Sequence, residues 1–207
     1  MTVESFANVI LLSHQTGDKR DYILNRVNDP VVEIVASLNR LRVERRGVQS
    51  ETSECITFTL VKSGAVAIEP TDPGRLQALS EQAKVLSANI AKHQAIIQKL
   101  EEFFPADDKD PTMEGLEKRL RTAQTGISRY ENSVRNVGIS VLSGYKNGGR
   151  WNLANIETHP SVVAEHQKAD PMIEQYKTTA TEMKSKIDAL YEILAGGAPG
   201  EKGMGEL

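Results

Sequence analysis

Apolar residues recur alternately three and four positions apart along three long segments of the chain, the spacing of an α-helix with one buried face. Such a repeat, kept over many turns, is typical of coiled coils. The first series follows Asp72-Pro73 and consists of Leu76, Leu79, Ala83, Leu86, Ile90, His93, Ile97, Leu100 and Phe104. The second follows Asp110-Pro111 and consists of Met113, Leu116, Leu120, Ala123, Ile127, Tyr130, Val134, Val137 and Val141.

Only the segment PADDKDP separates these two series. Because so short a connection places neighbouring helices side by side and antiparallel, residues 73–142 are predicted to form an antiparallel coiled-coil hairpin. Each arm would be about 45 Å long at 1.5 Å per residue. His93 interrupts the first apolar face, and a polar residue there sets the register or, being a histidine, makes the pairing sensitive to pH.

A third series follows Asp170-Pro171 and ends before Gly196-Gly197; its members are Ile173, Tyr176, Ala180, Met183, Ile187, Leu190 and Leu194. This helix also needs a partner for its apolar face. Two arrangements stay open: the helix folds back along the hairpin as a three-helix bundle, or it pairs with another copy of the chain.

The N-terminal part predicts one more helix and two strands. The helix is expected to begin after Asp29-Pro30 and to end at Gly47. The segment Cys55–Ile68, in which apolar Ile56, Phe58 and Leu60 alternate with threonines, predicts two short strands around Ser63-Gly64. Since a lone two-stranded sheet is marginally stable in water, it must pack on a helix or join the sheet of another chain.

Four of the eight prolines directly follow an aspartate, and each Asp-Pro pair is interpreted as a helix start. The aspartate accepts hydrogen bonds from the first turn, while proline lacks an amide hydrogen that would be unpaired at that position. The predicted starts are Asp29-Pro30, Asp72-Pro73, Asp110-Pro111 and Asp170-Pro171.

These elements predict a mainly α fold: an antiparallel coiled-coil hairpin plus a third heptad helix, forming a helical bundle, with a small β-hairpin. The expected organisation is an N-terminal helical segment with the β-hairpin, the coiled-coil hairpin, a Gly/Asn-rich loop with the C-terminal heptad helix, and a flexible Gly-rich tail. Their boundaries are 1–70, 71–143, 144–195 and 196–207.

Charge, cysteine content and the length of the apolar runs indicate where the protein is expected to reside. A net charge of -3 gives no general attraction to nucleic acid or anionic lipid. The single cysteine, Cys55, cannot form a disulfide within the chain, which favours a reducing compartment. The apolar run Phe6–Leu12 is far shorter than the roughly 20 residues that span a membrane. We expect a soluble cytoplasmic protein, or a component of a virion assembled in the cytoplasm, with no membrane partner.

The sequence contains none of the short motifs that indicate catalysis. There is no phosphate-binding GxxxxGK[ST] loop, GxGxxG, CxxC or GxSxG, and the four histidines lack the spacing of metal ligands. We therefore expect no enzymatic activity, no cofactor and no metal site.

Two charged clusters are candidate binding sites. Asp107, Asp108 and Asp110 surround Lys109 at the predicted tip of the hairpin. In shape alone this resembles the acidic hairpin tip of bacterial transcription factors that enter the secondary channel of RNA polymerase, although the chain carries no zinc finger. The simpler interpretation is that Asp110 caps the next helix.

The second cluster consists of Arg40, Arg42, Arg45 and Arg46, in the expected last turns of the first helix. Cations there complement the helix dipole, and the alternative is contact with phosphate or an acidic partner. In the glycine-rich loop, Arg150 and Trp151 could bind a nucleic-acid backbone and stack on a base, or Trp151 could anchor the loop on the core.

Three functions are open at this stage. The first is a structural or assembly protein, an oligomeric building block or adaptor that binds itself and other protein subunits, for example in a virus particle or a secretion machine. The second is a regulator that binds the transcription machinery or nucleic acid through the acidic tip or the arginines. A small enzyme ranks last.

Overall fold

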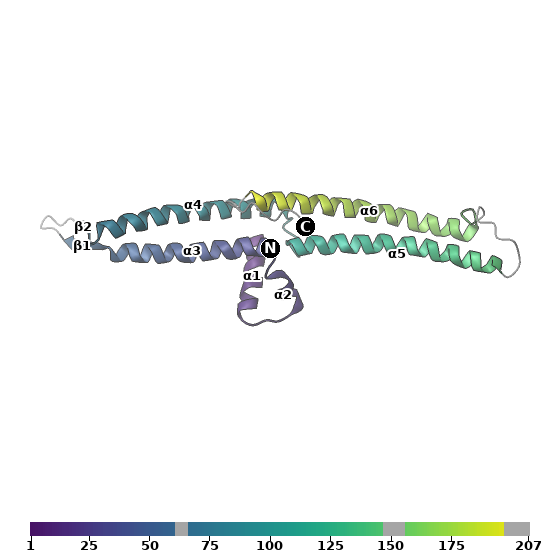
Figure 1. Cartoon of the computed structure of the whole chain (residues 1–207), viewed down its shortest axis with the longest axis horizontal. Coiled ribbons are helices and arrows are strands. Elements are labelled where there is room, and N and C mark those ends of the chain that lie inside the picture. Colours follow the sequence, from purple (N-terminus) through teal and green to yellow (C-terminus); the bar gives the residue numbers. More distant parts are fainter. Residues whose placement is uncertain (61–65, 147–155, 197–207) are drawn as a thin grey trace, which may run out of the picture. The chain divides into compact units, whose positions relative to one another are not determined.

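The computed structural model describes residues 1–60, 66–146 and 156–196, and this part of the chain is predominantly helical, which confirms the predicted fold class (Figure 1). Helix formation follows the apolar periodicity of the sequence. The elements are α1 (Val3–Gln15), α2 (Asp21–Arg26), α3 (Pro30–Glu54), β1 (Ile56–Leu60), β2 (Val66–Pro70), α4 (Pro73–Phe103), α5 (Met113–Lys146) and α6 (Pro160–Ala195).

The chain divides into two compact units. The first comprises residues 1–112 with the residues from Leu190 onward, and the second comprises residues 113–189.

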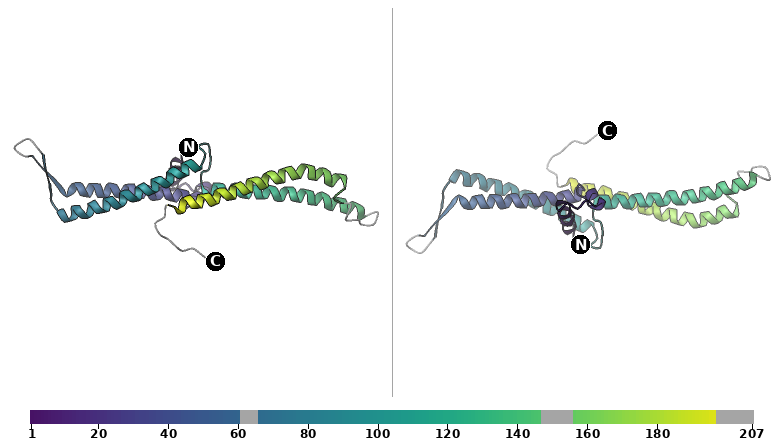
Figure 2. Two further views of the ribbon diagram at one scale, coloured as in Figure 1. Left: turned by 90° about the horizontal axis from the view of Figure 1, so that it is seen from above. Right: turned by 90° about the horizontal axis from the view of Figure 1, so that it is seen from below.

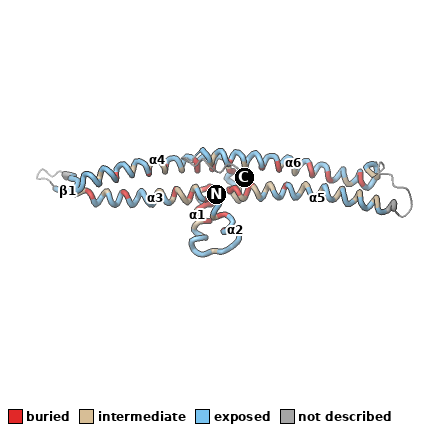
Figure 3. Tube along the Cα trace, in the orientation of Figure 1, coloured by how far each residue is buried: buried red, intermediate tan, exposed pale blue. Residues whose placement is uncertain are grey.

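In the first unit, α3 and α4 run antiparallel along each other and are joined by the β-hairpin (Figures 1 and 2). We call these two helices the α3–α4 stem. Helix α1 packs against both of them, and the buried residues follow the line between the helices (Figure 3). The larger core cluster contains Phe6, Ala7, Ile10, Ile23, Val32, Val35, Leu38, Ile90 and Ile97. A smaller cluster near the β-hairpin contains Val48, Cys55, Leu79 and Leu86.

In the second unit, α5 and α6 lie side by side and antiparallel (Figure 2). The ring of Tyr176 on α6 lies directly over Gly126 on α5, and the ring centroids of Tyr130 and Tyr176 are 6.1 Å apart. Farther along, Ser133 donates a hydrogen bond of 2.5 Å to Glu165. The third heptad helix therefore finds its partner within the chain.

The predicted hairpin of residues 73–142 is wrong in its pairing. Helix α4 packs on α3 in the first unit, whereas α5 packs on α6 in the second. A heptad series determines which face of a helix is buried but does not determine which helix covers it. Both α3 and α6 present apolar faces long enough to compete.

Two of the predicted helix starts are confirmed. Asp29 accepts a hydrogen bond from the backbone nitrogen of Val31, and Asp72 accepts one from that of Arg75, each at 3.0 Å. The expected end at Gly47 is wrong, because α3 continues to Glu54. Val48 is buried beyond the glycine, and its packing extends the helix.

The other two starts are wrong. Helix α5 begins at Met113, three residues after Asp110, whose carboxylate accepts hydrogen bonds from Arg26 and Thr112. Helix α6 begins at Pro160 and runs through Pro171. A proline inside a helix costs about 3 kcal/mol, but the turns before it bury Val162 and Ala169, whose burial offsets that cost.

The β-hairpin is confirmed. β1 and β2 pair antiparallel with Phe58 opposite Ile68 and Ile56 opposite Pro70. The predicted turn at Ser63-Gly64 lies outside the described residues.

Candidate functional site

The β-hairpin exposes an apolar pair that neither core cluster uses. Phe58 is 66% exposed and Ile68 is 63% exposed, although they lie directly opposite each other on one face of the sheet. The hairpin stands at the end of the α3–α4 stem farthest from α1, where β1 contacts α3 (Figure 1). Thus the sheet is attached to the end of the stem, while Phe58 and Ile68 are exposed within the described part of the chain.

The hydrogen-bond ladder fixes which backbone groups point away from the hairpin. The backbone nitrogen of Thr71 donates to the carbonyl oxygen of Cys55 at 2.9 Å, just beyond the paired strands. Because hydrogen-bonded and non-hydrogen-bonded pairs alternate along an antiparallel ladder, Thr57 and Thr59 turn their backbone groups toward β2. The backbone groups of Ile56 and Phe58 then point to the other edge of β1.

A second apolar surface is a groove of about 870 Å³ between α1 and α3. Leu12 and Val43 line it and are 61% and 64% exposed. At its base Asn39 donates a hydrogen bond of 2.8 Å to Asn8, which ties the two helices together. The groove is open and mainly apolar, a surface suited to protein contact rather than to catalysis.

The arginine cluster lies in the middle of α3, so the interpretation that these cations complement a helix end is wrong. Arg42 donates to Glu4 on α1 at 2.6 Å, and Arg40 donates to Ser37 at 3.0 Å. Arg45 and Arg46 are exposed and have no ion pair among the described residues. With Arg42 they line a depression of about 320 Å³ between α3 and α4, whose remaining lining is Gln49, Ile90 and Gln94. The depression carries a local positive charge on a chain that is acidic overall.

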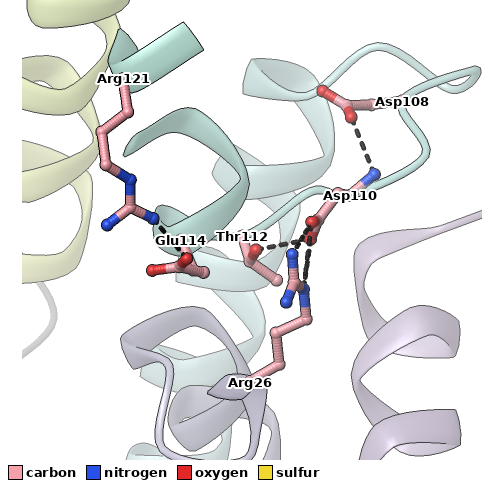
Figure 4. Close-up of polar contacts among 6 residues, drawn as sticks. All are labelled: Arg26, Asp108, Asp110, Thr112, Glu114 and Arg121. Carbon is pink, nitrogen blue, oxygen red and sulfur yellow. Dashed lines mark hydrogen bonds and ion pairs between the residues drawn. The ribbon is translucent and has the colours of Figure 1, made fainter. Parts of the chain in front are cut away.

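The acidic segment connects α4, which packs on α3, with α5, which packs on α6, so it is not the tip of the predicted hairpin. The Nε of Arg26 on α2 donates to both carboxylate oxygens of Asp110 at 3.0 Å, and the Oγ1 of Thr112 donates to the same carboxylate at 2.7 Å (Figure 4). Asp108 accepts from the backbone nitrogen of Asp110 at 3.0 Å, whereas Asp107 is exposed. Asp110 is thus a structural residue of the first unit.

Nothing in the sequence indicated that Arg26 is a buried structural residue. Its side chain is only 5% exposed, it lies 4.3 Å from the centroid of the Tyr22 ring, and its carboxylate partner is 84 residues away. Burial, followed by the charge of Asp110, raises the pKa of Tyr22. No local pattern marks one arginine among many as buried.

The remaining polar candidates are scattered. His93 is half-buried, and its Nδ1 lies 2.9 Å from the carbonyl oxygen of Asn89 in the same helix. In the described ranges no group of three or more His, Cys, Asp and Glu side chains is placed to hold a metal ion. Arg150 and Trp151 lie outside the described residues.

Within the same ranges no helix has the length and apolar character needed to cross a membrane.

The described fold defines a class, that of mainly α proteins built from paired antiparallel helices with a small β-hairpin. Comparison with protein-family models, curated proteins and solved structures gave no significant match.

Proposed function

We propose that the protein is a non-enzymatic structural or assembly protein, an oligomeric helical building block of a larger complex. The observation that carries the proposal is the exposed pair Phe58–Ile68 on a two-stranded sheet at the end of the α3–α4 stem. A sheet of two strands is marginal by itself, and burying one large apolar side chain contributes about 1.5–3 kcal/mol. A protein contact on this face would stabilise both the sheet and the assembly.

The stem supports this role because it does not need the β-hairpin for its own core. The larger core cluster lies around α1, and the smaller one reaches only to Cys55 at the start of β1. Beyond Ile56, the strand side chains whose burial the structure describes are all exposed: Thr57, Phe58, Thr59, Ile68, Glu69 and Pro70. Such an element is explained by a contact outside the subunit.

The test is the mass of the full-length protein in solution over a wide concentration range. Oligomers should form as concentration rises, and the double variant Phe58→Ser/Ile68→Ser should weaken association at least roughly tenfold, equivalent to about 1.4 kcal/mol. Val85→Ser is the matched control, because Val85 is apolar and 61% exposed on α4. A wild-type protein that stays monomeric throughout, or a double variant that associates like wild type, would contradict the proposal.

The arginine depression supports a second candidate function, the binding of nucleic acid. Arg45 and Arg46 carry charge that no ion pair offsets in the described residues, and phosphate contacts by such arginines give salt-dependent affinity. Fluorescence anisotropy with a labelled duplex should then show binding that Arg45→Gln/Arg46→Gln removes. Arg75→Gln is the control, because Arg75 is paired with Glu51 at 3.0 Å. Equal binding by both variants would exclude this function for the depression.

A further inference from the structure

The two edges of the β-hairpin differ in their ability to accept another strand. β1 has the sequence ITFTL, without charge or proline. β2 has the sequence VAIEP, in which Glu69 adds a charge and Pro70 lacks an amide hydrogen. Charges and prolines are the usual devices that protect an edge strand from pairing. Only the β1 edge lacks such protection.

We infer that β1 pairs antiparallel with β1 of a second copy of this chain, about a two-fold axis at Phe58, to form a four-stranded sheet. This inference rests on the proposed function and specifies how two copies would meet, namely along the β1 edge, which sets the Phe58 side chains of the two copies side by side. The outward backbone groups of Phe58 would exchange hydrogen bonds with those of Phe58 in the second copy. Ile56 would pair in the same way with the second copy's Leu60, so the alternation that leaves these groups unused within the hairpin fits the register.

Identical strands suit each other in this register. The faces of the two copies coincide, so that Ile68 and Phe58 of one copy continue in one row with Phe58 and Ile68 of the other. On the opposite face Thr57 lies across from the second copy's Thr59, and threonine pairs of this kind stabilise antiparallel sheets. Since β1 carries no charge, two copies meet without repulsion. Four strands also exceed the two-stranded limit of marginal stability.

Disulfide trapping tests the register directly. In a Cys55→Ala background, Thr57→Cys and Thr59→Cys are made as separate full-length proteins, one of them carrying a tag that changes its mass. The register brings residue 57 opposite residue 59 of the second copy in a non-hydrogen-bonded pair, with Cα atoms about 4.5 Å apart, within the range of a disulfide. Mild oxidation of the mixture should give several-fold more cross-linked dimer than oxidation of either protein alone.

Each outcome decides the inference. Cross-linking in the mixture alone supports the two-fold register at Phe58. Equal cross-linking of each protein with itself would show another register and overturn the inference. No cross-linking, while wild type still associates and Phe58→Ser/Ile68→Ser does not, would leave the proposed function standing and remove the β1 contact. No cross-linking together with a strictly monomeric wild type would refute both.

Discussion

Removing the carboxylate of Asp110 should destabilise the first unit severely, because this carboxylate forms an ion pair with the buried side chain of Arg26. The side chain of Arg26 is 5% exposed and that of Asp110 is 19% exposed. The guanidinium donates to both carboxylate oxygens, and Thr112 donates to one of them (Figure 4). Asp110→Ala would leave the buried cation without this carboxylate.

The expected magnitude follows from the burial. Deleting one partner of a buried pair typically costs about 3–5 kcal/mol, and the partial exposure of Asp110 places this pair near 3 kcal/mol. For a chain of this size each kcal/mol lowers Tm by about 2–4 °C, so a fall of roughly 6–12 °C is expected. Arg26→Met in combination with Asp110→Ala should recover part of the loss, because the double variant no longer buries a charge.

Calorimetry and urea unfolding followed by circular dichroism measure these changes. The control is Arg20→Ala, which removes a pair of similar geometry with Asp18 in which Arg20 is 74% exposed. This change should leave Tm unaltered, because solvent screens an exposed pair. If Asp110→Ala lowered Tm no more than Arg20→Ala, or if the double variant were the least stable of all, the pair would not be the buried, desolvated interaction described here.

Three further changes test the packing and the electrostatics. Replacing glycine by alanine within a helix normally raises the free energy of unfolding by about 1 kcal/mol. Urea unfolding should show this gain for Gly47→Ala, because an added Cβ meets nothing within 4 Å there. Gly126→Ala should instead lower the stability, because its Cβ would lie 2.8 Å from the Tyr176 ring. The pKa of Tyr22 is raised by burial and then by Asp110, so the folded state holds the phenol proton more tightly. The stability that the protonated Tyr22 contributes is fully present below the ordinary pKa of 10.0 and is lost as pH rises through the raised pKa. In urea unfolding at alkaline pH, Tyr22→Phe should therefore lose less stability than wild type. Pro171→Ala should raise the stability of the second unit by about 1–3 kcal/mol in thermal unfolding, because it restores an amide donor inside α6, and an unchanged or lower Tm would contradict the account of this helix.

The buried faces of the long helices could be predicted because helical periodicity is local. Leu79, Leu86, Ile90, Ile97 and Leu100 are all buried in α4, as the heptad series required. His93 occupies the same face and is half-buried, with its ring nitrogen bonded inside its own helix. Neighbours along the sequence are enough to define such a face.

The helix that packs on each apolar face could not be predicted. Several apolar faces of similar length compete, and periodicity does not say which of them pair. The expectation of a hairpin relied on the shortness of PADDKDP, and its Asp110 is instead fixed by Arg26 from far along the chain. The same limit applied to Asp170-Pro171. Its local signal for a helix start was outweighed by the burial of Val162 and Ala169 upstream.

The candidate site shows the same division between local and distant information. Alternation in the sequence predicted Phe58 on an apolar face of a strand, and the marginal stability of two strands predicted that the sheet packs on a helix or joins another chain's sheet. Whether the chain itself covers it depends on the position of every other element, and in the described residues no helix does so. A two-stranded sheet that is unprotected along β1 and exposed at Phe58 and Ile68 leaves its stabilising contact to another molecule. Among possible partners, a second β1 strand is the one whose register, faces and charge already match.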